Sequence, residues 1–130
     1  MNTVLFQIQD VIIKYAQTLY QILKVNVEIV DEKLYRVAGT GKFVNKINID
    51  MSSEGFIYKK VMLDKKKYIV KNPGENELCQ ECHNLDKCDE KLEICMPIIL
   101  NDSSIGVIGL VCNTDEQRNH VLSNFSTFEI

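Results

Sequence analysis

The stretch MPIILNDSSIGVIGLVC (residues 96–112) decides the fold of this chain. Two apolar runs rich in isoleucine and valine flank the polar residues Asn101 to Ser104. Runs of this composition favour strands, and the polar residues between them favour a turn. The stretch therefore predicts an antiparallel hairpin, which we expect at the centre of a sheet.

Three shorter segments before this hairpin also predict strands. Residues 25–30 alternate between apolar and polar side chains, and after a polar turn residues 34–38 can return as the second strand of a hairpin. Residues 68–70 form a third short apolar run before the turn signal at residues 73–74.

Helices are predicted to flank these strands. The first covers residues 3–23, where apolar residues recur at spacings of three and four. The second has a serine N-cap at residues 52–53 and carries the apolar residues Phe56, Ile57, Val61, Met62 and Leu63. The third begins at Thr114, which forms a capping box with Gln117. The order of elements predicts the α+β class, with a five-stranded antiparallel sheet and helices packed on it.

The first predicted helix has two apolar lines. One line consists of Val4, Ile8, Val11 and Tyr15. The other consists of Leu5, Ile12, Ala16, Leu19 and Leu23. One line can cover the sheet while the other packs on a second subunit, so we expect a homodimer formed through this helix.

The composition favours one globular domain covering residues 1–130. The chain is 45% hydrophobic and 25% charged, which suits a single packed core. It has no signal-peptide pattern and no apolar run of membrane length, which predicts a cytoplasmic protein without membrane contact. The net charge is −3, and the lysines of residues 59–71 lack interleaved arginines. We therefore expect no direct contact with nucleic acid.

The sequence offers no catalytic motif, and we expect no enzyme. It lacks a glycine-rich phosphate loop and a nucleophile elbow, and its two histidines are His83 and His120. Gly106 and Gly109 lie within a strand pattern, where a close backbone approach or a bulge explains them better than a cofactor motif. Cys112 lies alone in an apolar run and is predicted to be a small buried hydrophobe.

Four other cysteines, Cys79, Cys82, Cys88 and Cys95, lie in a long polar segment predicted to be a loop at residues 75–95. Four thiolates make a complete ligand set for zinc or for an iron-sulfur cluster. Structural zinc sites usually pair two C-x2-C motifs, and here only Cys79 and Cys82 form one. The irregular spacing favours a [4Fe–4S] cluster as the cofactor, with zinc as the alternative.

Several stretches resemble the amino-terminal sensory domains of sigma-54-dependent transcriptional activators from anaerobic bacteria. They are residues 27–32, 38–41 and 54–61, together with the cysteine loop and its continuation into residues 95–98. Residues 105–110 also resemble the closing strands of a GAF or PAS-like sensor. The cysteine loop is the specific part of this resemblance.

The resemblance implies a regulatory input domain that is a fragment of a longer regulator, followed by a further sensor domain, an ATPase domain and a helix-turn-helix domain. It also implies that the four cysteines ligate a metal centre that senses redox state or oxygen, and that changes at this centre reposition the last helix. Two alternatives stay open. One is a small-molecule-binding GAF or PAS-like module in which zinc orders the loop, and the other is a pure dimerisation module.

Overall fold

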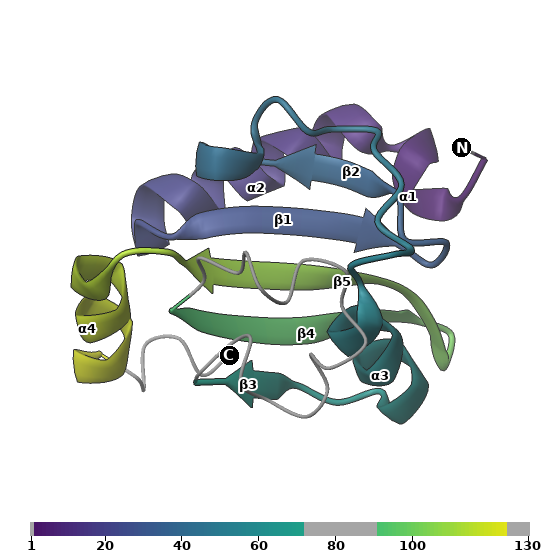
Figure 1. Cartoon of the computed structure of the whole chain (residues 1–130). Helices are drawn as coiled ribbons and strands as arrows, with labels where there is room; N and C mark the ends of the chain where they lie inside the picture. Colours follow the sequence, from purple (N-terminus) through teal and green to yellow (C-terminus); the bar gives the residue numbers. More distant parts are fainter. Residues whose placement is uncertain (1, 72–90, 125–130) are drawn as a thin grey trace.

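The computed structural model of the chain describes residues 2–71 and 91–124. Within these ranges the strands are β1 (Asn26–Asp31), β2 (Arg36–Gly39), β3 (Tyr68–Val70), β4 (Leu92–Leu100) and β5 (Ser103–Cys112). They form one five-stranded antiparallel sheet in the order β2-β1-β5-β4-β3 (Figure 1). The predicted fold class is confirmed, and β5 of the predicted hairpin is the central strand.

The turn between β4 and β5 is shorter than predicted. Asn101 and Asp102 have φ values of 52° and 67°, and the flanking residues Leu100 and Ser103 already pair across the hairpin. Two consecutive residues with positive φ are typical of a type I′ turn, whose twist matches that of the strands. Asn and Asp tolerate this conformation better than most residues, so two residues suffice.

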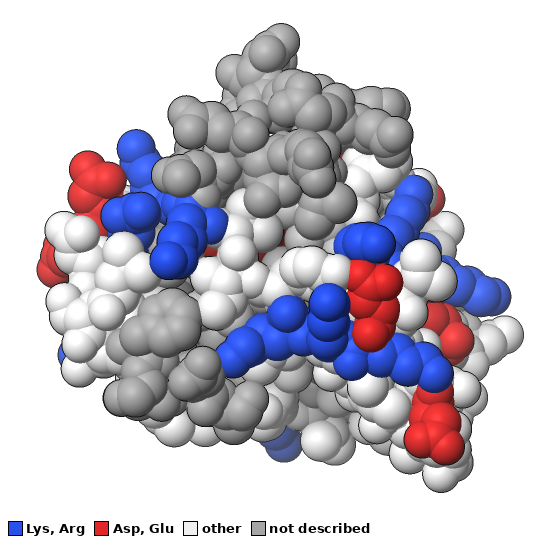
Figure 2. Space-filling view, turned by 90° about the horizontal axis from the view of Figure 1, so that it is seen from below, with Lys and Arg blue, Asp and Glu red and all other residues white. Residues whose placement is uncertain are grey.

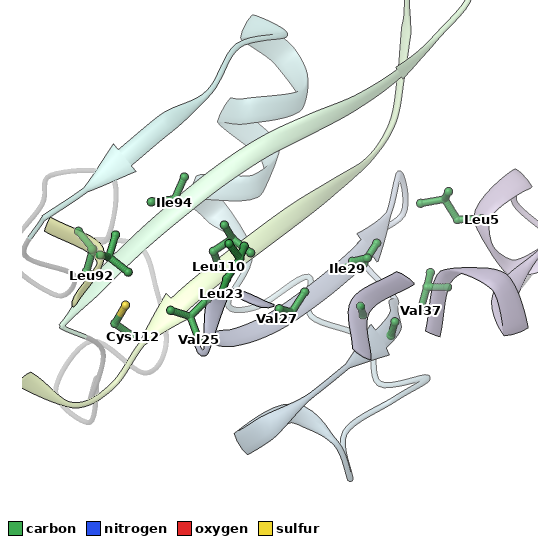
Figure 3. Packing of buried hydrophobic residues seen from close by; sticks show 13 residues of the cluster. Leu5, Leu23, Val25, Val27, Ile29, Val37, Leu92, Ile94, Leu110 and Cys112 are labelled. Carbon is green, nitrogen blue, oxygen red and sulfur yellow. The ribbon is translucent and has the colours of Figure 1, made fainter. Parts of the chain in front are cut away.

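The helices lie on both sides of the sheet. They are α1 (Val4–Gln7), α2 (Gln9–Leu23), the 3-10 turn η1 (Gly41–Phe43), α3 (Phe56–Asp64) and α4 (Asp115–Ser123). The first apolar cluster joins α2 and α4 to one side of the sheet and includes Ala16 and Val121. Figure 3 shows Leu23 and Val27 of this cluster. The second cluster joins α3 to the opposite side through Val61 and Val107.

The predicted N-terminal helix is interrupted. Ile8 has φ −119° and ψ 32°, so it separates α1 from α2 and the prediction of one helix over residues 3–23 is wrong at this point. The interruption accompanies the packing of Leu5 against β5, where its Cδ1 lies 2.5 Å from the position that a side chain on Gly106 would take. A glycine at this position admits the leucine.

The two apolar lines of this segment are divided between the core and solvent. Leu5, Ala16 and Leu23 of the inner line are buried. The outer line of Val4, Ile8, Val11 and Tyr15 is 40%, 45%, 62% and 49% exposed. The prediction that one line covers the sheet is confirmed, and the outer line remains available to a partner.

The two other helix starts differ in how well the sequence predicted them. Thr114 Oγ1 accepts a hydrogen bond from the Gln117 amide at 3.1 Å, which confirms the cap of α4. The serine cap of α3 is wrong, because the helix starts at Phe56 after Gly55. The amide of Ser52 donates to Asp50 Oδ1 at 2.8 Å, so this serine belongs to the preceding turn.

Lysines on and near α3 contact their own neighbours. Lys60 Nζ lies 3.3 Å from Asp64 Oδ2, and Lys59 Nζ lies 4.5 Å from the centre of the Phe56 ring. Figure 2 shows Lys and Arg side chains on this side of the molecule with Asp and Glu among them. The absence of nucleic-acid contact stays a prediction. Across the described ranges, no helix has the length and apolarity needed to cross a membrane.

Candidate functional site

A row of residues crosses the middle of the sheet on the side that α3 covers. Glu28 of β1 is the direct partner of Gly109 of β5, and Gly109 is in turn the direct partner of Cys95 of β4. Tyr68 of β3 is the partner of Cys95. Direct partners point to the same side of a sheet, so the carboxyl and thiol groups flank the glycine.

Tyr58 of α3 reaches into this row at the glycine. A Cβ atom on Gly109 would lie 2.1 Å from Tyr58 Oη, closer than atoms approach one another. The hydroxyl donates to Glu28 Oε2 at 2.6 Å. Gly109 was expected to allow a close backbone approach or a bulge, and the structure shows instead that it admits a phenol hydroxyl.

The other oxygen of Glu28 is paired with Arg36 of β2. Arg36 Nε donates to Glu28 Oε1 at 2.7 Å, and Nη2 lies 2.6 Å from the same oxygen. Both residues are buried. Arg36 Nη1 also donates to the Lys46 carbonyl at 2.9 Å, and the guanidinium lies 5.1 Å from the Phe43 ring centre. The carboxylate is thus neutralised and hydrogen-bonded on both oxygens, as a buried charge requires.

Tyr58 is held in its neutral form by this environment. Burial is the main reason why the pKa of the Tyr58 phenol lies well above its ordinary value. Charges on Glu28, Glu93 and Cys95 raise this pKa further, and so does the hydrogen bond to Glu28. At physiological pH the phenol is therefore a hydrogen-bond donor to the carboxylate.

Cys95 is the part of the predicted metal site that the structure describes. It lies inside β4, because pairing between Leu92 and Cys112 starts the strand three residues earlier, and its side chain is fully buried in the second cluster. It therefore belongs to the sheet and not to the predicted loop. Cys79, Cys82 and Cys88 lie outside the described residues. Within residues 2–71 and 91–124, no group of three or more His, Cys, Asp or Glu side chains is arranged to hold a metal ion.

Cys112 lies in the first apolar cluster, apart from Cys95. It is 2% exposed and belongs to the same cluster as Leu92 (Figure 3) and Val121. Burial raises the pKa of its thiol to about 11. The prediction of a small buried hydrophobe is confirmed, and the thiol stays protonated at neutral pH.

Sequence reasoning missed Glu28, Arg36 and Tyr58. The alternation in residues 25–30 placed Glu28 on a polar side, which predicts contact with water. Two signals were present. An acid stands between β-branched residues, and an arginine follows it eight positions later across a predicted hairpin turn.

Comparison with known proteins gives one matching regulator and a set of similar folds. No family model matches the chain. The chain is 36% identical over 127 residues to UacR of Escherichia coli K12, a protein named as a uric acid sigma-54-dependent transcriptional regulator. The match covers 98% of this chain and 22% of that protein, so the chain spans about a fifth of its length.

The similar solved structures include GAF domains. The nlh2 GAF domain of A. aeolicus, in an inactive state, has a TM-score of 0.63 and 18% identity, over 90% of this chain and 74% of that chain. The cofactor-binding GAF domain of the nutrient sensor CodY from Clostridium difficile has a TM-score of 0.56 and 15% identity, over 88% and 78%. The chain has the GAF fold.

Proposed function

We propose that this chain is the signal-sensing GAF domain of a bacterial sigma-54-dependent transcriptional regulator. The observation that carries this proposal is the match over 98% of the chain to one segment of such a regulator. The GAF fold supports it, because the described part of the chain has the architecture of known sensor modules. The proposed role is regulatory and not catalytic.

We propose further that Cys79, Cys82, Cys88 and Cys95 hold a [4Fe–4S] cluster that senses redox state or oxygen. The spacing of the cysteines supports an iron-sulfur cluster. The position of Cys95 in β4 supports a direct connection between this cluster and the sheet. Cys95 presents a soft thiol donor on the side of the sheet that α3 covers. When bound, a cluster would supply electron transfer and sensitivity to air.

Metal analysis of the domain purified without oxygen tests this proposal. We expect a brown protein with about four iron atoms and four sulfides per chain, which loses iron and colour together in air. Cys95→Ser should remove most of the iron. Cys112→Ser is the matched control, because it changes a buried cysteine of the other cluster and should keep full iron content. Full iron content in the Cys95→Ser protein would contradict the assignment of this ligand.

A second candidate function is the binding of a small-molecule effector, with zinc held by the same four cysteines. The observation that favours it is the similarity to the CodY domain, which is itself described as cofactor-binding. In this case the anaerobic protein is colourless and stable in air, and it contains one zinc per chain. The metal analysis therefore separates the two candidates directly.

We also propose that the domain is a homodimer through the outer line of α1 and α2. Val4 lies on α1, Ile8 at the junction, and Val11 and Tyr15 on α2, and all four apolar side chains are at least 40% exposed. Exposed apolar side chains gathered along one segment mark an interaction site. Residues 3–23 contain only one acidic and one basic side chain, Asp10 and Lys14. Depletion of charge is typical of the centre of a protein interface.

Light scattering tests the dimer. The chain has a mass of 14.9 kDa, so the wild-type domain is expected at about 30 kDa, twice that value, at micromolar concentration. Val11→Asp buries a charge at the outer line and should shift the mass to that of a monomer. Leu63→Asp is the control, since Leu63 is 77% exposed on α3 and lies outside the outer line. A wild-type monomer at tens of micromolar would contradict the proposal.

A further inference from the structure

The hydroxyl of Tyr58 lies between Glu28 of β1 and Cys95 of β4. On one side it donates to Glu28 at 2.6 Å. On the other side lies Cys95, whose strand position is directly opposite the glycine over which the hydroxyl sits. Direct antiparallel partners have Cβ atoms about 4.5–5.5 Å apart. The side chain of Cys95 therefore borders the same notch as the phenol.

This notch exists because Gly109 has no side chain. Any larger residue would place a Cβ atom 2.1 Å from Tyr58 Oη and expel the hydroxyl. Tyr58 and Cys95 also belong to one packed cluster, which includes Val61 and Val107. The hydroxyl of Tyr58 on α3 thus fills the notch, and Glu28 of β1 and Cys95 of β4 lie on its two sides.

We infer that Tyr58 is a positioning residue that couples Cys95 to the buried Glu28–Arg36 pair. A group carried by the Cys95 sulfur occupies space beside the phenol, so it alters the position of Tyr58 and its hydrogen bond to Glu28. Because Tyr58 is part of α3, the same displacement is felt by that helix. This inference deepens the proposed function, since it rests on Cys95 being the residue that receives the signal.

The coupling continues beyond Glu28 through further hydrogen bonds. Glu28 holds Arg36, and Arg36 Nη1 holds the Lys46 carbonyl at 2.9 Å. The backbone of the same region pairs with β2, where the Arg36 amide donates to the Ile49 carbonyl at 2.9 Å. A contiguous chain of polar contacts therefore runs from the centre of the sheet to its β2 edge, and hydrogen-bond networks of this kind are one route by which distant sites are coupled.

A double-mutant cycle on the metal-free domain tests the inference without using a cofactor. Tyr58→Phe removes only the hydroxyl, and Cys95→Ala removes only the thiol. We expect the effect of Tyr58→Phe on the unfolding equilibrium constant to differ by at least threefold between the two backgrounds, as for residues in contact. Measurement by urea denaturation gives this factor.

Tyr68→Phe is the matched control for this cycle. Tyr68 is the cross-strand partner of the same cysteine, but its hydroxyl donates to Asp64 Oδ2 on α3. Removing that hydroxyl should give effects that add to those of Cys95→Ala within twofold. Additive effects for Tyr58→Phe, or equal coupling for both tyrosines, would overturn the inference.

A second measurement uses Co²⁺ as a probe of the four-cysteine site. The thiolate-to-Co²⁺ charge-transfer bands report on the thiolate ligands of the metal. Loss of a group that positions such a ligand typically weakens metal affinity by about 10- to 100-fold. We expect Tyr58→Phe to shift these bands and weaken binding by about tenfold or more, with Tyr68→Phe unchanged. Unchanged bands and affinity in the Tyr58→Phe protein would overturn the inference. If the wild-type domain binds no Co²⁺, the proposed metal site fails, whereas the cycle still decides the coupling.

Discussion

Replacing Arg36 with methionine is expected to lower the free energy of unfolding by about 3–5 kcal/mol, the usual cost of removing one partner of a buried ion pair. Glu28 would keep a single donor, the Tyr58 hydroxyl at 2.6 Å, and would lose both contacts to the guanidinium. A carboxylate that is 2% exposed cannot replace these donors with water. The Lys46 carbonyl would lose its donor as well.

Denaturation with urea measures this change, provided that the dependence on urea concentration stays constant between variants. Arg118→Met is the matched control, because Arg118 makes a single exposed hydrogen bond to the Lys91 carbonyl at 3.1 Å. It should cost less than about 1 kcal/mol, as for exposed polar contacts. An Arg36→Met protein as stable as this control would show that the pair contributes nothing to the fold.

The double variant Glu28→Gln with Arg36→Met separates the loss of a charge partner from the loss of packing. A neutral amide needs no counter-ion, and its oxygen can still accept from Tyr58. The double variant should therefore recover a large part of the stability that Arg36→Met loses, because replacing both members of a buried pair is often nearly neutral. Equal losses in the single and double variants would assign the effect to packing.

The sheet was predictable because its signals are local. Alternation in residues 25–30 and the paired apolar runs of residues 96–112 each depend on neighbouring residues alone. The division of the N-terminal helix into an inner and an outer line was predictable for the same reason. Side chains three and four positions apart share a face of a helix, wherever the helix packs.

The candidate site was less predictable because it depends on packing between distant segments. The alternation of residues 25–30 does not show that Glu28 is buried, because α3 follows much later in the chain and covers that side of β1. The first residues of β4 could not be recognised from the sequence for a similar reason. Glu93 is charged, like many residues of the polar segment before it, yet it is 6% exposed and pairs with Val70 and Val111 in the sheet. Cys95 was therefore assigned to the loop.

Replacing Asp31 with alanine is the second change with a large expected effect. Asp31 is fully buried at the end of β1. Its Oδ1 accepts from the amides of Lys33 and Tyr35 at 3.0 and 2.9 Å, and its Oδ2 accepts from Thr3 Oγ1 at 2.7 Å. Hydrogen bonds to a charged acceptor contribute about 1.5–3 kcal/mol each and do not add fully, so we expect a loss of about 3–5 kcal/mol.

This carboxylate holds two separate segments together. The amide contacts fix the β1–β2 turn, in which Leu34 adopts a positive φ of 66° that favours glycine. The Thr3 contact ties the segment before α1 to the same turn. The alanine variant should therefore release α1 as well as the turn.

Two variants divide these roles. Asp31→Asn keeps an oxygen for the two amides and an NH2 group for Thr3, so it should cost about 1–2 kcal/mol. Thr3→Val removes only the tether of α1 and should cost about 1 kcal/mol. Hydrogen exchange then locates the effect, because Thr3→Val should speed exchange in α1 and leave the turn protected. Slow exchange in α1 of the Asp31→Ala protein would show that Leu5, and not the carboxylate, anchors α1. The outer line that begins at Val4 would then keep its position without this hydrogen bond.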